Sequence, residues 1–290
     1  MTLAAAPARP EIVVATDAHE GPVHVAAEDA LYFTTVPRPG DEGPRVDIRR
    51  LALDGRRLST VRCDANAANG MALAADGRLL VCEQGSRTRP AAITLVDRAT
   101  GETEVLADRR GGVPLNSPND VVAGPDGAVW FTDPGYGHLQ GFRPAPRAGD
   151  DVLRIDPRSG GVTIAADGFD KPNGLAFSPD GGTLYVADSG ATEVVAFDAG
   201  ADGALSGRRP FAAAIPRYPD GLAVGDDGRV YIATGRGVQV HDPSGAPIGE
   251  IPVPGGAVNL TFGGPGRDVL LITADDAIWA ASLDAPSTRP

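Results

Sequence analysis

The chain has 290 residues, of which 42% are hydrophobic and 22% charged, a composition typical of a folded globular domain. Its 38 glycines and 26 prolines favour a turn-rich β structure over helices. The formal net charge of −12 argues against nucleic acid or an anionic membrane as a partner. No apolar run is long enough to span a bilayer, so we expect no membrane partner.

The first ten residues, 1–10, are expected to form a disordered lead. They lack the basic start and long apolar core of a signal peptide. Two cysteines, Cys63 and Cys82, are too few for a disulfide framework or a cysteine zinc site. We therefore expect a cytoplasmic protein with free thiols, and a single disulfide bridge is the alternative. Residues 11–290 are expected to form one domain, since no linker or change of composition interrupts them.

A repeated hairpin organises the chain. Each copy has a polar loop, a short strand, a turn that carries Asp-Gly in the clearer copies, and a second strand. The copies span residues 20–34, 69–81, 118–132, 171–190, 219–233 and 258–273. The residues that precede the first strands are 49, 50, 54, 47 and 38 positions apart. Six copies at this spacing predict an all-β fold, a six-bladed β-propeller.

At each end of the chain, a segment predicted to form a strand belongs to no complete blade. Residues 11–16 form a β run before the first repeat, and residues 277–283 leave the last blade one strand short. We expect the N-terminal strand to complete the last blade, which closes the ring and leaves no open sheet edge at the seam.

In such a ring, the innermost strands all start at the same end of a central channel. The residues aligned at these starts are predicted to face one funnel: Glu20, Asn69, Asn119, Asn173, Asp220 and Val258. Glu20, Asn119, Asn173 and Asp220 would supply four side-chain oxygens with a net charge of −2, which suits a hard cation. We predict one divalent cation, Ca²⁺ in the first place, with Zn²⁺, Mg²⁺ or Mn²⁺ as alternatives. Asn and Asp also favour turns before strands, and for any single position that explanation stays open.

The segment 133–150 is longer than a turn requires and carries aromatic and basic side chains. We predict a lid or substrate-selecting loop at the edge of the funnel. The predicted substrate contacts are Asn69, Ser117, Tyr136, His138, Phe142, Arg143 and Tyr218. Asp133 and Asp188, at the ends of second strands, are predicted to cap turns or backbone. The roles of His19 and His24, which flank the first predicted ligand, stay open, and Val258 predicts an apolar wall in the sixth blade.

At these positions the chain resembles the gluconolactonase / senescence-marker-protein (regucalcin) family of six-bladed propellers, which includes bacterial lactonases. The motifs that carry the resemblance are Glu20-Gly-Pro22, Ser117-Pro-Asn-Asp120, Pro172-Asn-Gly174 and Pro219-Asp-Gly221. The resemblance implies that Glu20, Asn173 and Asp220 are metal ligands and that Asp220 is the candidate general base. It implies for Asn119 a role as fourth ligand or direct substrate contact.

Two departures from the family pattern leave the preference for sugar lactones open: Val23-His24 where the family often has Trp, and Ser117 where animal members have Arg. The expected function is a divalent-metal-dependent lactonase, a carboxylic ester hydrolase in which Asp220 and Asn119 act in catalysis. A small lactone would be the partner, and the protein would be a monomer or a weak homo-oligomer. The alternatives are hydrolysis of a phosphotriester or a natural-product lactone at the same metal site, or a non-enzymatic calcium-binding scaffold.

Overall fold

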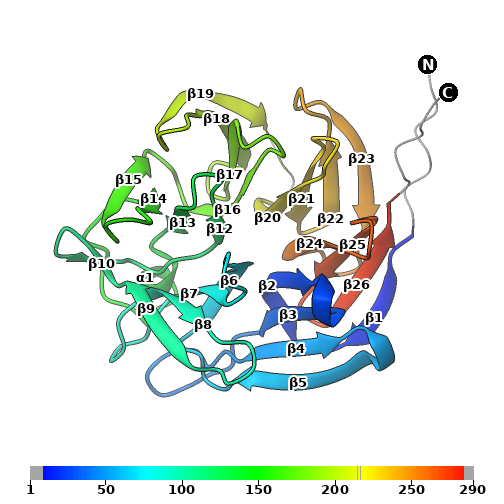
Figure 1. Ribbon diagram of the computed structural model, residues 1–290, viewed down its shortest axis with the longest axis horizontal. Coiled ribbons are helices and arrows are strands. Elements are labelled where there is room, and N and C mark those ends of the chain that lie inside the picture. The colour runs from blue at the N-terminus through cyan, green and yellow to red at the C-terminus, as the bar shows by residue number, and fades with distance from the viewer. Residues whose placement is uncertain (1–8, 214, 216, 284–290) are drawn as a thin grey trace.

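The structure is a computed structural model that describes residues 9–213, 215 and 217–283. These residues form six four-stranded antiparallel sheets arranged in a ring, which confirms the predicted all-β, six-bladed propeller (Figure 1). Of the predicted lead, residues 1–8 lie outside the described residues.

Each of the first three blades is a meander in which consecutive strands pair, from the innermost strand to the outermost. The first contains β2 (Ala18–Val25), β3 (Ala30–Thr35), β4 (Ile48–Ala52) and β5 (Arg57–Arg62). The second contains β6 (Ala68–Leu73), β7 (Leu79–Glu83), β8 (Ala92–Val96) and β9 (Thr103–Ala107). The third contains β12 (Val121–Ala123), β13 (Val129–Asp133), β14 (Asp151–Ile155) and β15 (Val162–Ala166).

The remaining blades follow the same plan. The fourth contains β16 (Pro172–Phe177), β17 (Thr183–Asp188), β18 (Glu193–Ala199) and β19 (Leu205–Ala212). The fifth contains β20 (Pro219–Val224), β21 (Val230–Thr234), β22 (Gly237–His241) and β23 (Pro247–Pro252). The sixth contains β24 (Asn259–Gly263), β25 (Val269–Thr273), β26 (Ala277–Ser282) and, as its outermost strand, β1 (Glu11–Ala15).

The seam of the ring lies in the sixth blade. Strand β1 pairs antiparallel with β26, from Glu11 opposite Ala280 to Ala15 opposite Ala277. Figure 1 shows these two strands, from opposite ends of the chain, side by side at the right of the ring. The prediction that the N-terminal strand completes the last blade is therefore confirmed.

The Asp-Gly turns between first and second strands share one local structure. In the third blade, Asp126 accepts a hydrogen bond from the backbone N–H of Ala128 at 3.1 Å, and Gly127 has a φ of 77°. A residue without a Cβ adopts this left-handed conformation at no steric cost, and Asp stabilises such turns through its own side chain. The second, fourth and fifth blades repeat the arrangement at Asp76, Asp180 and Asp227.

Apolar side chains fill the spaces between the blades. The buried residues group into six clusters, one for each interface between neighbouring blades. For example, Tyr32 of the first blade packs with Leu79 of the second, and Trp130 of the third packs with Val186 of the fourth. A single sheet cannot bury both of its apolar faces, so the ring is the arrangement that removes them from water. It also brings the six innermost strands into contact, each with the next around the axis.

Few elements depart from the blades: the α-helix α1 (Tyr136–Leu139), the hairpin of β10 (Arg109–Arg110) and β11 (Val113–Pro114), and the 3₁₀ turns η1 (Ala26–Glu28) and η2 (Asp54–Arg56). None of the helices in the described part of the chain has the length and apolarity to cross a membrane. Both cysteines are free thiols, with Cys63 exposed and Cys82 buried.

Candidate metal and substrate site

A cavity of about 460 Å³ opens at the end of the channel where the innermost strands begin. All four predicted ligands line it: Glu20, Asn119, Asn173 and Asp220. They lie between 47 and 200 residues apart in the sequence, and each comes from the start of a different innermost strand. Asn69, from the second blade, also lines the cavity, as does the exposed ring of Tyr218 at its mouth.

The oxygens of this ring have few partners. Glu20 is 2% exposed, and Asn119 and Asn173 are each 5% exposed. The Oδ1 atoms of Asn119 and Asn173 are buried and accept no hydrogen bond from the described residues. Buried polar atoms normally have partners, so two such oxygens beside two carboxylates fit a hard cation. The described residues contain no cluster of three His, Cys, Asp or Glu side chains that could hold a metal, so the donor set depends on the amide oxygens.

The electrostatics of the ring also fit a bound cation. Burial raises the pKa of Glu20 well above its ordinary value, and the nearby Asp220 and Asp120 raise it further. Burial also raises the pKa of Asp220 to about 6, although the charge of His19 and a hydrogen bond with Asn173 oppose this rise. None of the ion pairs among the described residues neutralises either carboxylate. A bound cation would stabilise the charged forms of both groups.

Hydrogen bonds between blades hold the ring residues in place. The backbone carbonyl of Asn119 accepts hydrogen bonds from Asn69 Nδ2 at 3.0 Å and from the Gly70 N–H at 2.8 Å. The hydroxyl of Thr34 donates to the carbonyl of Asn69 at 3.1 Å. These bonds fix the start of the second blade's innermost strand against the first blade, and the residues before β12 against the second blade.

The long segment after β13 forms one wall of the cavity. It contains α1, whose Tyr136 lines the cavity together with Gln140, the next residue after the helix. Burial raises the pKa of Tyr136 to about 12, so its hydroxyl keeps its proton and can donate a hydrogen bond. Asp150 anchors the wall by accepting hydrogen bonds from the Gly135 N–H at 3.0 Å and the Lys171 N–H at 3.3 Å.

Four predicted substrate contacts lie outside the lining of this cavity. Ser117 is fully buried; its hydroxyl donates to the Pro134 carbonyl at 2.7 Å and accepts from the Gly137 N–H at 2.9 Å. Phe142 is buried, and His138 is exposed on α1. Arg143 donates to the carbonyls of four residues: Ser86, Arg89, Leu115 and Asn116. Ser117 and Arg143 thus hold the wall in position instead of facing the cavity.

The two predicted capping carboxylates perform that role. Asp133 accepts hydrogen bonds from the backbone N–H groups of Asn116 at 2.9 Å and Ser117 at 3.0 Å. Asp188 accepts from the N–H groups of Asp170 at 2.9 Å and Ala191 at 3.2 Å. Both predictions are confirmed, and both residues fix segments next to the cavity.

Several lining residues were not predicted from the sequence. Gln84, Gln140, Lys171 and Ser189 add polar groups to the cavity. Lys171 and Ser189 lie near the ends of the fourth repeat copy but not at the aligned ring position, and Gln84 and Gln140 lie outside the copies, so the repeat did not single them out. His19 lines the mouth, where its Nδ1 lies 2.7 Å from Asp275 Oδ1, whereas His24 belongs to a pocket at the opposite end of the channel.

The sixth blade also differs from the prediction. From Val258, the sixth blade was expected to line the funnel with an apolar wall. Instead, the next residue, Asn259, places its amide in the channel, where it donates a hydrogen bond to Glu20. The aligned repeats contained a signal for this. The residue after each ring position is glycine in four blades, but it is Asp120 in the third and Asn259 in the sixth.

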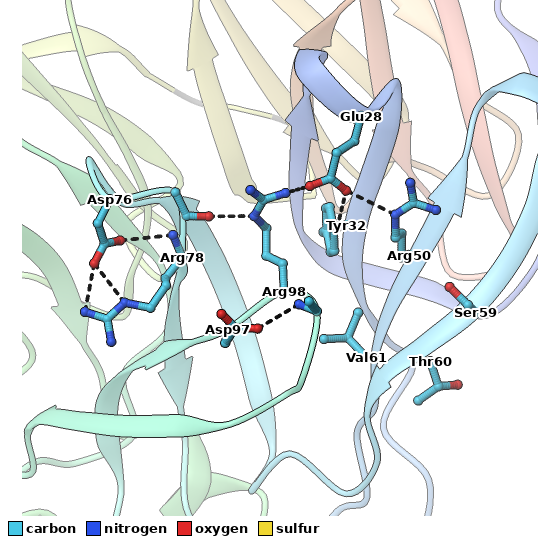
Figure 2. Close-up of a pocket in the computed structure, with 12 residues that line it drawn as sticks. Glu28, Tyr32, Arg50, Ser59, Thr60, Val61, Asp76, Arg78, Asp97 and Arg98 are labelled. Carbon is cyan, nitrogen blue, oxygen red and sulfur yellow. Dashed lines mark hydrogen bonds and ion pairs between the residues drawn. The ribbon is translucent and has the colours of Figure 1, made fainter.

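A separate pocket of about 450 Å³ lies between the first two blades (Figure 2). Glu28 is at its centre, where it pairs with Arg98 and with Arg50 at 3.3 Å, and it accepts from the Tyr32 hydroxyl at 2.6 Å. Arg78, on the other side, pairs with Asp76. The arginines of this pocket are therefore engaged with carboxylates of the same chain, and we assign no ligand to it.

The fold and the cavity together define a six-bladed propeller with a ring of oxygen-bearing side chains at one end of its channel. The chain belongs to the family described as SMP-30/Gluconolactonase/LRE-like region, which matches residues 18–276.

Curated relatives include lactonohydrolase oryL of Aspergillus oryzae, 31% identical over 288 residues. That match covers 87% of this chain and 64% of the relative, so the chain spans less than two thirds of the relative's length. A gluconolactonase of Zymomonas mobilis is 28% identical, with 92% of this chain and 79% of the relative covered. Among solved structures, a gluconolactonase of Xanthomonas campestris has a TM-score of 0.84 at 37% identity, covering 95% of this chain and 90% of the other.

Proposed function

We propose that this protein is a divalent-metal-dependent lactonase that opens sugar lactones or related small lactones to hydroxy acids. The observation that carries the proposal is the pair of buried, unpartnered carboxamide oxygens of Asn119 and Asn173, on side chains that line the same cavity as Glu20 and Asp220. The relatives named gluconolactonase and lactonohydrolase support the reaction class.

These four residues would hold the cation through oxygen atoms alone, which favours Ca²⁺, with Mg²⁺, Mn²⁺ or Zn²⁺ as alternatives. When bound, the cation polarises the lactone carbonyl and lowers the pKa of water. Four protein oxygens are fewer than the six to eight that Ca²⁺ takes, so substrate and water have room beside them.

Two residues of the chain have separate roles in the proposed hydrolysis. Asp220, a buried carboxylate whose pKa is raised by burial and lowered again by the nearby cation charge, would accept a proton from the attacking water. Asn119 orients the carbonyl of the lactone. The water oxygen attacks the carbonyl carbon, the ring C–O bond breaks, and the ring oxygen leaves as a hydroxyl group with the proton that Asp220 accepted. One lactone and one water thus give one hydroxy acid.

The lining of the cavity supports a hydroxylated substrate. Asn69, Gln84, Tyr136 and Gln140 present uncharged hydrogen-bonding groups, and Tyr218 offers a ring at the mouth. Such groups suit the hydroxyls of a sugar lactone, because each buried donor or acceptor of the site needs a partner in the complex. We propose Asn69, Tyr136 and Tyr218 as substrate contacts.

The test combines metal removal with a lactone panel. The full chain, stripped with a chelator and checked for metal content, is assayed on gluconolactone, an acyl lactone, an aromatic lactone and a phosphotriester, with and without added Ca²⁺. We expect acid release above the spontaneous rate only with metal, and greatest on the sugar lactone. Full activity in metal-free protein would overturn the mechanism. Metal binding without any hydrolysis would favour the scaffold alternative, and preference for the phosphotriester would favour the other enzyme class.

A further inference from the structure

Directly inside the ring of predicted ligands, the channel contains a second polar pair. Asp120 and Asn259 come from the third and sixth blades, on opposite sides of the ring, and are 7% and 4% exposed. Asn259 Nδ2 lies 2.6 Å from Glu20 Oε2 and 3.4 Å from Asp120 Oδ2. One amide therefore connects the carboxylate of a predicted ligand to a buried carboxylate that the proposed reaction does not use.

The chain makes room for this amide. At the equivalent position of the fifth blade stands Gly221, and a Cβ there would collide with the side chain of Asn259. Gly70 of the second blade stands in the same relation to Asp120. The two polar side chains therefore fill space that the neighbouring blades leave open, and they are not crowded into the channel.

The orientation of the amide is fixed by its own hydrogen bonds. Asn259 Oδ1 accepts from the backbone N–H of Leu260 at 2.7 Å, which directs Nδ2 toward the two carboxylates. The reversed orientation would face an oxygen with two carboxylates and leave the Leu260 N–H without this acceptor. The Asn259 backbone is held as well, because its carbonyl accepts from the Thr273 hydroxyl at 3.2 Å.

The contacts of Glu20 are asymmetric. Its Oε2 accepts both the Asn259 amide and the backbone N–H of Gly21, the latter at 3.2 Å. We infer that Asn259 is a positioning residue for the metal site: it holds Glu20 by Oε2 and thereby presents Oε1 to the cation. This inference rests on the proposed function, since it assumes that Glu20 is a ligand. Groups that orient metal ligands in this way contribute substantially to metal affinity.

The test measures Ca²⁺ binding directly, by titration calorimetry on chelator-stripped full-length protein. In Asn259→Leu, which keeps the branched shape but removes the donor, we expect the Kd for Ca²⁺ to rise by about 10- to 100-fold. Asn259→Ala should shift the Kd in the same direction, and it fits wherever Asn fits if the leucine variant fails to fold. Saturating Ca²⁺ should restore most of kcat in both variants, because Asn259 does not touch the substrate.

A matched control separates positioning from general stability. Asn66 also donates its amide to a buried carboxylate, Glu83 Oε2 at 2.8 Å, but outside the channel. Asn66→Ala should lower the melting temperature of the metal-free protein and leave the Kd for Ca²⁺ unchanged. If the Asn259 variants lower the melting temperature but bind Ca²⁺ as the wild type does, the inference is wrong and the amide is only structural. If the wild-type protein itself binds no Ca²⁺, it is the proposed function that fails.

Discussion

The hydroxyl of Thr132 in the third blade donates a hydrogen bond to the backbone carbonyl of Asn173 in the fourth blade, at 2.9 Å. The same hydroxyl accepts from the Asp120 N–H at 3.1 Å, and Thr132 is fully buried. A residue that looks like a plain strand position thus connects the blade that carries one predicted ligand to the blade that carries another.

Thr132→Val should therefore weaken both the fold and the site. Valine keeps the shape but leaves a buried carbonyl and a buried N–H without this partner, at a cost of about 1–3 kcal/mol in the free energy of unfolding. Urea denaturation measures the loss, and calorimetry should show weaker Ca²⁺ binding, because Asn173 loses its anchor. Thr132→Ser keeps the hydroxyl and serves as control. Wild-type behaviour of the valine variant in both assays would contradict this account.

Metal-free protein should become less stable as the pH rises. Burial raises the pKa of Asp120 from 3.8 to about 7 and that of Asp220 from 3.8 to about 6. Between about pH 4 and 7, the folded state therefore retains protons that the unfolded state has released, so the free energy of unfolding falls with increasing pH. At about 1.4 kcal/mol per pKa unit, the two rises together correspond to a loss on the order of 5–10 kcal/mol.

Thermal melts of chelator-stripped protein at pH 5 and pH 7 test this prediction. Added Ca²⁺ should stabilise the protein more at pH 7, because the ionised carboxylates bind it. Asp120→Asn, which removes one of the titrating groups, should flatten the pH dependence of the metal-free form. A melting temperature of stripped protein that increased from pH 5 to pH 7 would contradict the predicted burial of these charges.

Arg143 should affect substrate binding without touching substrate. Its guanidinium donates to the carbonyls of Ser86 and Arg89 in the second blade, at 3.0 and 3.1 Å, and so fixes the wall that carries Tyr136. Arg143→Met should raise KM several-fold while leaving the Kd for Ca²⁺ unchanged, because the predicted ligands stand on other elements. Arg208→Met is the control, since Arg208 also donates to backbone carbonyls, at 2.8 and 3.1 Å, but on the outer strand of the fourth blade.

The fold and the ring of predicted ligands could be predicted from the sequence because both repeat with a regular spacing. The repeat spacing located every innermost strand, and the position before each strand identified Glu20, Asn119, Asn173 and Asp220 together. The wall after β13 has no such period. Ser117 and Arg143 have side chains that suit a substrate, but their partners are backbone groups that only the folded loops bring near.

Asn259 was missed for a different physical reason. Turn conformation alone explains a glycine after a ring residue, so the two blades that lack this glycine do not by themselves predict a side chain in the channel. The structure gives another explanation, because a Cβ at Gly70 would also collide with the Asn119 backbone of the next blade. Only the packing of adjacent innermost strands shows why a side chain at position 120 or 259 must point into the channel.

Two substitutions in the ring should have different consequences. In Asp220→Asn the proposed base is lost while an oxygen donor remains, so kcat should fall by at least about 100-fold, the usual contribution of a general base. In Glu20→Gln a charged ligand becomes neutral, so the Kd for Ca²⁺ should rise while saturating metal restores much of kcat. Steady-state kinetics with gluconolactone at several Ca²⁺ concentrations separate the fall in kcat from the rise in the Kd for Ca²⁺. Asn116→Ala, a buried amide beside the wall but outside the ring, controls for stability. If saturating Ca²⁺ rescued Asp220→Asn to the wild-type rate, another group would have to accept the proton from water.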